Sequence, residues 1–176
     1  MATYYDLPKA NTNGAMQNIL IRNIKPADNI AIAKIIRNSL EEFNANKPGT
    51  AYFDASTDTL FEVFTTVNSI YFIAEQDNEI LGGAGIYPTQ NLPADTCELV
   101  KLYLSKAARG KGIGKLLMEK CFIAAKNMGY KKIYLETMPE LNIAVPMYEK
   151  IGFTYLQSPK GNSGHCGCNI WMIKDL

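Results

Sequence analysis

The stretch ELVKLYLSKAARGKGIGKLLMEKC, residues 98–121, decides the fold of this chain. Apolar side chains alternate along its first part, which predicts a strand over residues 96–104. After the glycines, apolar residues recur at helical spacing, which predicts a helix that begins near Ile113 and ends at Gly129. The chain therefore passes from a strand to a helix through a short glycine-rich loop.

The glycine-rich loop has the features of an anion-binding site. Glycines let the main chain approach a ligand closely, and the first N–H groups of a helix lack partners while the helix dipole favours an anion. Leu116 follows the last lysine, where a Walker A loop needs Ser or Thr, and Leu117 stands where a dinucleotide fingerprint needs glycine. We therefore expect a phosphate or pyrophosphate cradle of another kind, or an exposed basic turn without a ligand. The residues of this loop are Arg109, Gly110, Lys111, Gly112, Ile113, Gly114 and Lys115.

Outside this stretch the pattern predicts further strands and helices of a single α/β domain. The expected strands are residues 19–24, 70–74, 80–87, 132–137, 153–156 and 169–173, and the expected helices are residues 26–43, 60–67 and 141–150. Pro146 lies inside the last helix, so it must kink that helix or move its start. The Gly82-Gly83 pair predicts a bulge or a close approach of the backbone.

A second motif, MYEKIGF, lies at residues 147–153. Together with the pattern Arg-x-x-Gly-x-Gly at Arg109, Gly112 and Gly114, it resembles the GNAT superfamily of acyl-CoA-dependent N-acetyltransferases. The two motifs also lie at the separation that is usual in that family. The order of the expected elements over residues 19–173 also resembles the family pattern.

The resemblance implies an α/β (α+β) fold with a mixed, mostly antiparallel central sheet of six or seven strands, flanked by about four helices. Residues 19–176 would form the N-acetyltransferase domain. Residues 1–18 show no periodicity and are expected to be an N-terminal extension.

The activity that the resemblance implies is the transfer of an acetyl group from acetyl-CoA, a co-substrate, to a primary amine of a small molecule or protein. The amine would attack the thioester directly, without a metal. The alternative is a non-catalytic acyl-CoA-binding or sensing module on the same fold. The sequence does not indicate the acceptor, because acceptor pockets are built from variable loops. Homodimers are common in the family, so a dimer is also an expectation.

The family pattern implies where the coenzyme binds. The glycine-rich loop would hold the pyrophosphate. The backbone of Leu102, Tyr103 and Leu104 would pair with the pantetheine arm, and the Leu104 N–H would point at the thioester carbonyl. Asn142 lies near the start of the last helix, where the family often uses an asparagine on the coenzyme. An ordinary helix cap is the alternative for Asn142.

Two residues correspond to catalytic groups of the family. Tyr148 matches the general acid that protonates the coenzyme thiolate, and a core aromatic residue is the alternative for Tyr148. Glu98 lies six residues before Leu104, where several family members carry a general base that acts through water. Strand alternation places Glu98 on the same face as Leu102 and Leu104. A solvated or salt-bridged carboxylate is the alternative for Glu98.

The segment His165-Cys166-Gly167-Cys168 suggests a metal or redox protein as a third hypothesis. Only three potential ligands cluster there, and their spacing differs from that of zinc sites, so no metal site is predicted. His165 is a candidate for lining the acceptor end of the cleft or for assisting proton transfer. The Glu41-Glu42 pair and residues 44–54 lie where the family builds its acceptor pocket, although a solvated helix end is the commoner meaning of such a pair.

Composition excludes several classes of protein. A chain of 176 residues is long enough for one domain, and its 47% hydrophobic residues argue against disorder. Lys and Arg total 18 against 17 for Asp and Glu, so the basic surplus typical of nucleic-acid binders is missing. No apolar run approaches the roughly 20 residues of a membrane span, and the first 18 residues do not read as a signal peptide. With four cysteines, the expected setting is the cytoplasm, without a nucleic-acid or membrane partner.

Overall fold

The computed structural model describes residues 19–176, and the expected N-terminal extension, residues 1–18, lies outside the described residues. A seven-stranded sheet forms the middle of the domain, in the order β1-β2-β3-β4-β5-β7-β6. Neighbouring strands are antiparallel, except for the parallel pair β4 and β5. This arrangement confirms the expected mixed, mostly antiparallel sheet. The strands are β1 (Leu20–Asn23), β2 (Ile70–Gln76), β3 (Glu79–Tyr87), β4 (Thr96–Leu104), β5 (Lys132–Thr137), β6 (Thr154–Tyr155) and β7 (Ile170–Asp175).

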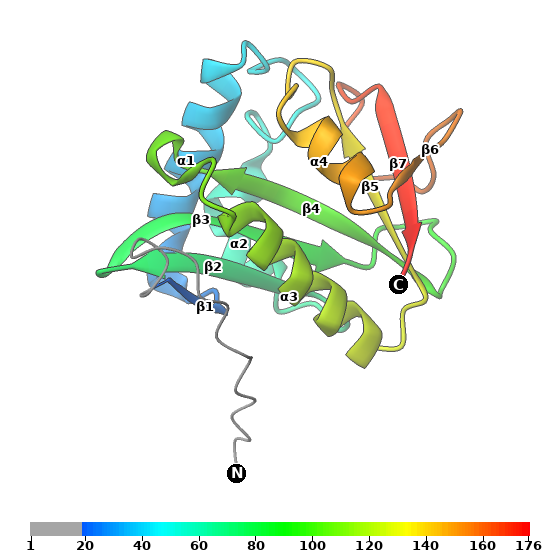
Figure 1. Ribbon diagram of the computed structural model, residues 1–176, viewed down its shortest axis with the longest axis horizontal. Helices are drawn as coiled ribbons and strands as arrows, with labels where there is room; N and C mark the ends of the chain where they lie inside the picture. The colour runs from blue at the N-terminus through cyan, green and yellow to red at the C-terminus, as the bar shows by residue number, and fades with distance from the viewer. Residues whose placement is uncertain (1–18) are drawn as a thin grey trace.

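Helices cover both faces of the sheet (Figure 1). α1 (Asn29–Glu42) and the short α2 (Leu60–Val63) lie on one face, and α3 (Ile113–Asn127) and α4 (Ala144–Lys150) lie on the other. Each face has its own buried apolar cluster, one beneath α1 and one beneath α3. No helix within residues 19–176 has both the length and the apolar character that a bilayer span requires.

Pro146 moves the start of α4 rather than kinking it. The helix begins at Ala144 instead of the expected position 141, so Pro146 falls in its first turn. A proline is tolerated there because the N–H groups of the first turn have no intrahelical partner. Three-residue or five-residue 3-10 turns precede α1, α2 and α3 at Pro26–Asp28, Ala55–Thr59 and Lys106–Ala108.

β4 carries a β-bulge in its second half. Tyr103 pairs with Gly83 of β3 and Val100 pairs with Gly85, so two residues of β4 lie opposite one residue of β3. The bulged residue Lys101 has a φ of +50°, in the left-handed region. The bulge that the Gly82-Gly83 pair predicts is a separate one: Gly82 pairs with Ala74 of β2 and Ile80 pairs with Glu75, so β3 has an extra residue next to Gly82.

The bulge overturns one prediction made from strand alternation. Leu99 packs in the same apolar cluster as Leu102 and Leu104, beneath α3. Its neighbour Glu98 therefore faces the other side of the sheet, and the expectation that Glu98 shares a face with Leu102 and Leu104 is wrong. The physical reason is the extra residue at Lys101, which moves every later side chain of β4 to the opposite face.

β4 and β5 pair only over their first halves. The parallel ladder runs from Thr96 opposite Lys132 to Glu98 opposite Tyr134, and within the described residues it goes no further. Beyond Glu98 the two strands diverge (Figure 1). The edge of β4 that faces β5 is therefore without a partner strand in its second half, where its main-chain groups are available to a ligand.

Candidate active site

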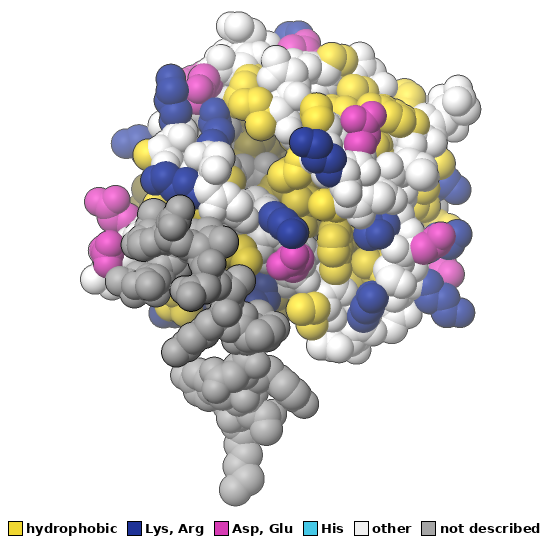
Figure 2. Space-filling model, in the orientation of Figure 1, with side chains coloured by type: hydrophobic (Ala, Val, Ile, Leu, Met, Phe, Trp, Pro, Cys, Tyr) yellow, Lys and Arg dark blue, Asp and Glu magenta, His cyan; other side chains and the backbone are white. Residues whose placement is uncertain are grey.

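A cleft of about 320 Å³ lies where β4 and β5 diverge, between α3 and α4; we call it the main cleft. Figure 2 shows this part of the surface hollowed, with hydrophobic side chains along it and Lys and Arg side chains around it. Its volume falls in the usual range for small-molecule sites, about 300–1,000 Å³. The predicted site residues that line it are Leu102, Tyr103, Leu104, Arg109, Gly110, Gly112, Ile113, Gly114, Lys115 and Tyr148.

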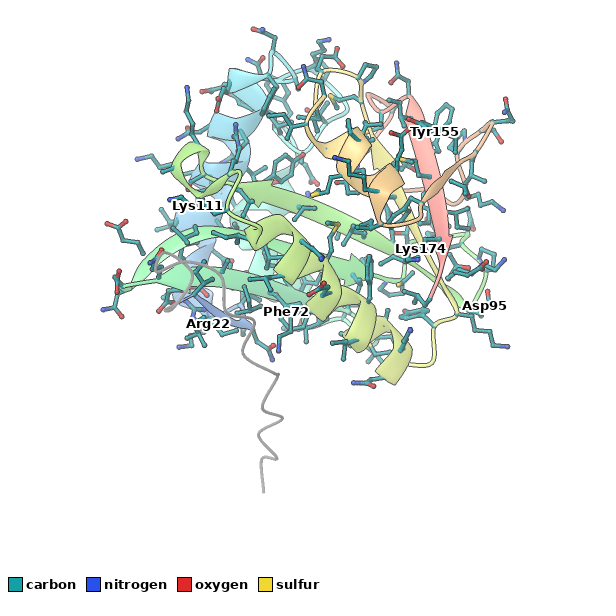
Figure 3. The ribbon with its side chains drawn as sticks, viewed as in Figure 1. Arg22, Phe72, Asp95, Lys111, Tyr155 and Lys174 are labelled. Carbon is teal, nitrogen blue, oxygen red and sulfur yellow. The ribbon has the colours of Figure 1, made fainter. Side chains whose placement is uncertain are left out.

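Two residues predicted to bind the coenzyme do not line the main cleft. Lys111 is exposed on the loop before α3 (Figure 3). Asn142 is exposed in the turn before α4, although Leu141 and Ile143 on either side of it do line the cleft. Because α4 begins at Ala144, Asn142 is not its capping residue.

The loop before α3 presents free main-chain N–H groups. Gly110 and Gly112 have φ values of +74° and +77°, a region that glycine adopts without steric cost. Gly112 is the N-cap of α3, and no described side chain caps this helix. The first intrahelical hydrogen bond runs from the Leu116 N–H to the Gly112 carbonyl, at 3.1 Å. The N–H groups of Ile113 to Lys115 therefore lack an intrahelical partner and can bind an anion.

The Arg109 side chain is turned away from this loop and towards α1. Its Nε donates to the Leu104 carbonyl at 3.2 Å, and its terminal nitrogens lie 3.0 Å from Glu42 and 3.2 Å from the Ser39 hydroxyl. The guanidinium also stacks over the Phe43 ring, 4.9 Å from its centre. These contacts hold the loop against the end of α1 and leave the main chain of the loop to face the cleft.

Tyr148 of α4 borders the main cleft and is only 6% exposed. Its hydroxyl makes no hydrogen bond with any described residue, so it is free to act on a ligand. Burial raises the pKa of Tyr148 above its usual value, which keeps the phenol protonated at neutral pH. A protonated phenol beside the open edge of β4 is a suitable proton donor.

A smaller cavity of about 50 Å³, which we call the second cavity, lies next to the main cleft. Tyr103 and Leu141 line both, so the two spaces adjoin at these residues. The sequence-predicted residues Glu98 and His165 lie here rather than in the main cleft. The polar side chains of the second cavity belong to Thr50, Glu98, Lys101, Glu136, Thr137, His165 and Cys168.

Glu98 is a buried carboxyl group, 2% exposed. The Thr89 hydroxyl donates a hydrogen bond to its Oε2, and no described residue donates to its Oε1. Burial raises the pKa of Glu98 to about 7, the nearby Glu136 adds to the rise, and Thr89 and Lys101 oppose it. A carboxyl group with this pKa can accept a proton near neutral pH, as a general base must.

The other charged groups of the second cavity are mostly paired. The Lys101 ammonium lies 2.9 Å from Asp54, and its side chain is 7% exposed. His165 Nε2 lies 3.7 Å from the same carboxylate, and burial lowers the pKa of His165, which favours the neutral ring. Glu136 accepts a hydrogen bond from the Ser163 hydroxyl at 2.9 Å.

Sequence reasoning missed Lys101, Glu136 and Thr137 as site residues. Glu136 and Thr137 could have been found, because they end a strand predicted as residues 132–137 and strand ends commonly carry functional residues. The acidic pair considered for the acceptor pocket lies elsewhere: Glu41 accepts from the Tyr52 hydroxyl, and neither it nor Glu42 lines the second cavity.

The cysteine and histidine segment contributes side chains to the second cavity but forms no metal-binding group. Cys166 is exposed, whereas Cys168 lines the cavity and burial raises its pKa to about 12. Across residues 19–176, no three His, Cys, Asp or Glu side chains gather as metal ligands would.

The fold and the main cleft have the form of a GNAT-type acyltransferase, and the comparisons agree. The sequence model of the Acetyltransferase (GNAT) family matches residues 34–153. This chain belongs to the GNAT acetyltransferase family and is an acyltransferase of that type.

Its relatives include N-acetyltransferases from bacteria. The uncharacterized N-acetyltransferase YjgM of Escherichia coli K12 is 36% identical over 166 residues, which cover 93% of this chain and 99% of that protein. A GNAT-family acetyltransferase from Staphylococcus aureus Mu50 superposes with a TM-score of 0.78 at 19% identity, over 89% of this chain and 98% of the other. PaiA N-acetyltransferase of Thermoplasma acidophilum, solved in complex with coenzyme A, superposes with a TM-score of 0.72 at 19% identity, over 91% of this chain and all of the other. The two structures show a shared fold.

Proposed function

We propose that this protein transfers an acetyl group from acetyl-CoA to a primary amine by direct attack of the amine on the thioester. One observation carries the proposal. The unpaired edge of β4 and the free N–H groups of α3 border the same cleft, and a buried carboxyl group with a pKa of about 7 lies just beyond Tyr103. The coenzyme A bound to PaiA N-acetyltransferase, which shares the fold, supports acetyl-CoA as the donor.

The coenzyme would be held mainly by main-chain groups. The N–H groups at the start of α3 bind the pyrophosphate, and Lys111 and Lys115 add positive charge near it. The free edge of β4 over Leu102 to Leu104 pairs with the amides of the pantetheine arm, as an added strand would. The Leu104 N–H then stabilises the negative charge that develops on the thioester carbonyl oxygen. Asn142 remains a proposed coenzyme contact at the turn before α4.

Two side chains move the protons. Glu98 takes a proton from the acceptor ammonium, which leaves the nitrogen lone pair free to attack the carbonyl carbon. A carbon–nitrogen bond forms and the carbon–sulfur bond breaks. Tyr148 gives its proton to the departing thiolate, because a phenol and a thiol have similar intrinsic pKa values, about 10 and about 8.5. The products are an amide and free coenzyme A.

The test is an acceptor screen with acetyl-CoA, in which thiol release and the acetylated product are followed by absorbance and mass spectrometry. We expect release for at least one primary amine, and its loss in Tyr148→Phe with unchanged coenzyme affinity. Tight coenzyme binding without thiol release for any amine would contradict the proposal and favour a non-catalytic sensing module.

A further inference from the structure

Two side-chain oxygen atoms of residues that line the second cavity have no hydrogen-bond partner among residues 19–176. Thr137 is 3% exposed, and its Oγ1 is the one fully buried side-chain polar atom of that part of the chain without a partner. Glu98 Oε1 is the second, since the Thr89 hydroxyl donates only to Oε2, but it is not fully buried. An unpaired buried polar group costs free energy, so the Thr137 hydroxyl, together with a partnerless carboxylate oxygen in the same cavity, indicates a ligand that supplies the missing hydrogen bonds.

The charges around these atoms favour a cationic ligand with several N–H donors. Lys101 is already paired with Asp54, and His165 is held neutral by burial. The carboxyl groups of Glu98 and Glu136 remain, and no cationic side chain in the described part of the chain is bound to either. An ammonium group can donate to both Glu98 Oε1 and Thr137 Oγ1, whereas a carboxylate placed there would be repelled.

The size of the second cavity limits what can be attached to that ammonium. A volume of about 50 Å³ holds only a few water-sized groups, since each needs about 10–15 Å³ on this measure. The nitrogen and one unbranched carbon fit in this space. Each group added to that carbon takes up a large share of the remaining volume, so a second alkyl branch is disfavoured and a carboxylate more so.

His165 and Cys168 of the segment between β6 and β7 line the second cavity, and main-chain groups of this segment anchor it by hydrogen bonds. The Lys160 N–H donates to the Tyr134 hydroxyl at 3.1 Å. The Asn162 N–H donates to the Gln90 carbonyl at 2.7 Å, and the Gly167 N–H donates to the Gly49 carbonyl at 3.0 Å. These anchors at three points hold the segment that carries His165 and Cys168 beside the cavity.

We infer that the second cavity binds the ammonium head of the acceptor through Glu98 and Thr137, and that it selects primary amines on an unbranched carbon without a neighbouring carboxylate. This inference rests on the proposed function, in which Glu98 is the proton acceptor. Thr137 is a binding residue for the acceptor nitrogen. Glu136 adds negative charge beside the ammonium without contacting it directly.

The first test compares three acceptors of similar size in the holoenzyme reaction with acetyl-CoA. Butan-1-amine has an unbranched carbon, butan-2-amine adds a branch, and 2-aminobutanoate adds a carboxylate to that branch. We expect kcat/KM to fall about tenfold or more at each step. Equal or faster reaction of either branched compound would overturn the inference while leaving the proposed function intact.

The second test removes the unpaired hydroxyl. Thr137→Val keeps the size of the side chain, so we expect KM for butan-1-amine to rise about tenfold, with kcat and coenzyme affinity nearly unchanged. Its thermal midpoint should not fall, because the variant also removes an unsatisfied buried group. Thr137→Ser should restore KM. Thr96→Val is the control, since Thr96 is also 3% exposed but bonds to Asp95 outside the second cavity. An unchanged KM in Thr137→Val refutes the role of Thr137.

Calorimetry separates failure of this inference from failure of the proposed function. If no amine is acetylated, butan-1-amine is titrated into the wild-type protein saturated with coenzyme A. Binding that Thr137→Val weakens upholds the ammonium site although the catalytic proposal has failed. Absence of binding, or equal binding to both proteins, overturns the ammonium site as well.

Discussion

The main cleft and the second cavity share Tyr103 and Leu141 as a common wall, yet they are built differently. The main cleft is about 320 Å³, and much of its lining comes from one continuous stretch, residues 102–115, whose main chain would bind the coenzyme in the proposed function. The second cavity is about 50 Å³ and depends on polar side chains from separate segments. A site made of main chain tolerates side-chain changes, whereas a site made of side chains depends on each one. Substitutions should therefore have larger effects in the second cavity.

The largest effect is expected for Glu98→Gln. Loss of the general base should lower kcat by about 10²–10³-fold. The same variant should be more stable than wild type at pH 8, by about 1–3 kcal/mol, because a buried charge is removed. Stopped assays and thermal unfolding measure the two effects, with the exposed Glu79→Gln as a control for both. A loss of activity accompanied by a loss of stability would instead indicate a structural role for Glu98.

Tyr148→Phe removes the proposed general acid of the main cleft, and we expect a smaller loss of activity than for Glu98→Gln. We expect kcat to fall about 10²-fold, because the coenzyme thiolate loses its proton donor. The hydroxyl has no hydrogen-bond partner among residues 19–176, so stability and the Kd for acetyl-CoA should stay within twofold of wild type. Isothermal titration and steady-state kinetics measure these quantities. Activity near the wild-type level would show that water, rather than Tyr148, protonates the thiolate.

The pH profile follows from the raised pKa of Glu98, which is about 7. Below that pH the carboxyl group is protonated and cannot act as a base, so kcat/KM should fall about tenfold per pH unit, and above it kcat/KM should level off. Glu136, Lys101 and His165 border the same cavity, and burial moves the pKa of His165 downward, away from this inflection. Persistence of the inflection in Glu98→Gln would assign it to another group.

The raised pKa of Glu98 also makes the stability of the fold depend on pH, in the direction opposite to that of kcat/KM. Because the folded state holds the Glu98 proton more tightly than the unfolded state does, stability should fall as pH rises from about 4.5 to about 7. Glu98→Gln should remove this part of the dependence. Urea unfolding of both proteins at pH 5 and pH 8 measures it, and parallel curves would contradict the buried position of the charge.

The smallest effect is expected in the main-chain loop. Gly110→Ala places a side chain at a φ of +74° in open space, so it should cost about 1–2 kcal/mol of stability and weaken acetyl-CoA binding about five- to tenfold. Gly129→Ala is a matched control at the other end of α3, with a φ of +88° and equally open space. It should cost similar stability without changing coenzyme affinity. Equal affinity in both variants would argue against the loop as the pyrophosphate site.

The elements that border the main cleft could be predicted from the sequence because they are close together along the chain. The strand, loop and helix over residues 96–127 follow from alternation, glycine content and helical periodicity, each of which is a local property. Pro146 also acted locally, since its ring excludes it from a helix interior and moves the start of α4 to Ala144.

The face on which Glu98 lies could not be predicted in this way. The bulge at Lys101 depends on the Tyr71 hydroxyl, which donates to the Lys101 carbonyl at 2.8 Å, and on the ion pair with Asp54. Both partners are distant in sequence, so alternation within the strand gave the wrong face. Thr137 was not predicted as a site residue because its role also depends on a distant segment. Nothing in its own strand shows that β4 and β5 diverge beside it.

The sequence by itself determined the family, the element order and the glycine-rich loop, because these depend on short-range patterns and on residue types that only certain backbone conformations accept. Tertiary structure alone decided which buried groups meet in the second cavity. The unpaired hydroxyl of Thr137 and the raised pKa of Glu98 both arise from burial among segments far apart in the chain. Burial is a property of the packed molecule, so residue order alone does not reveal it.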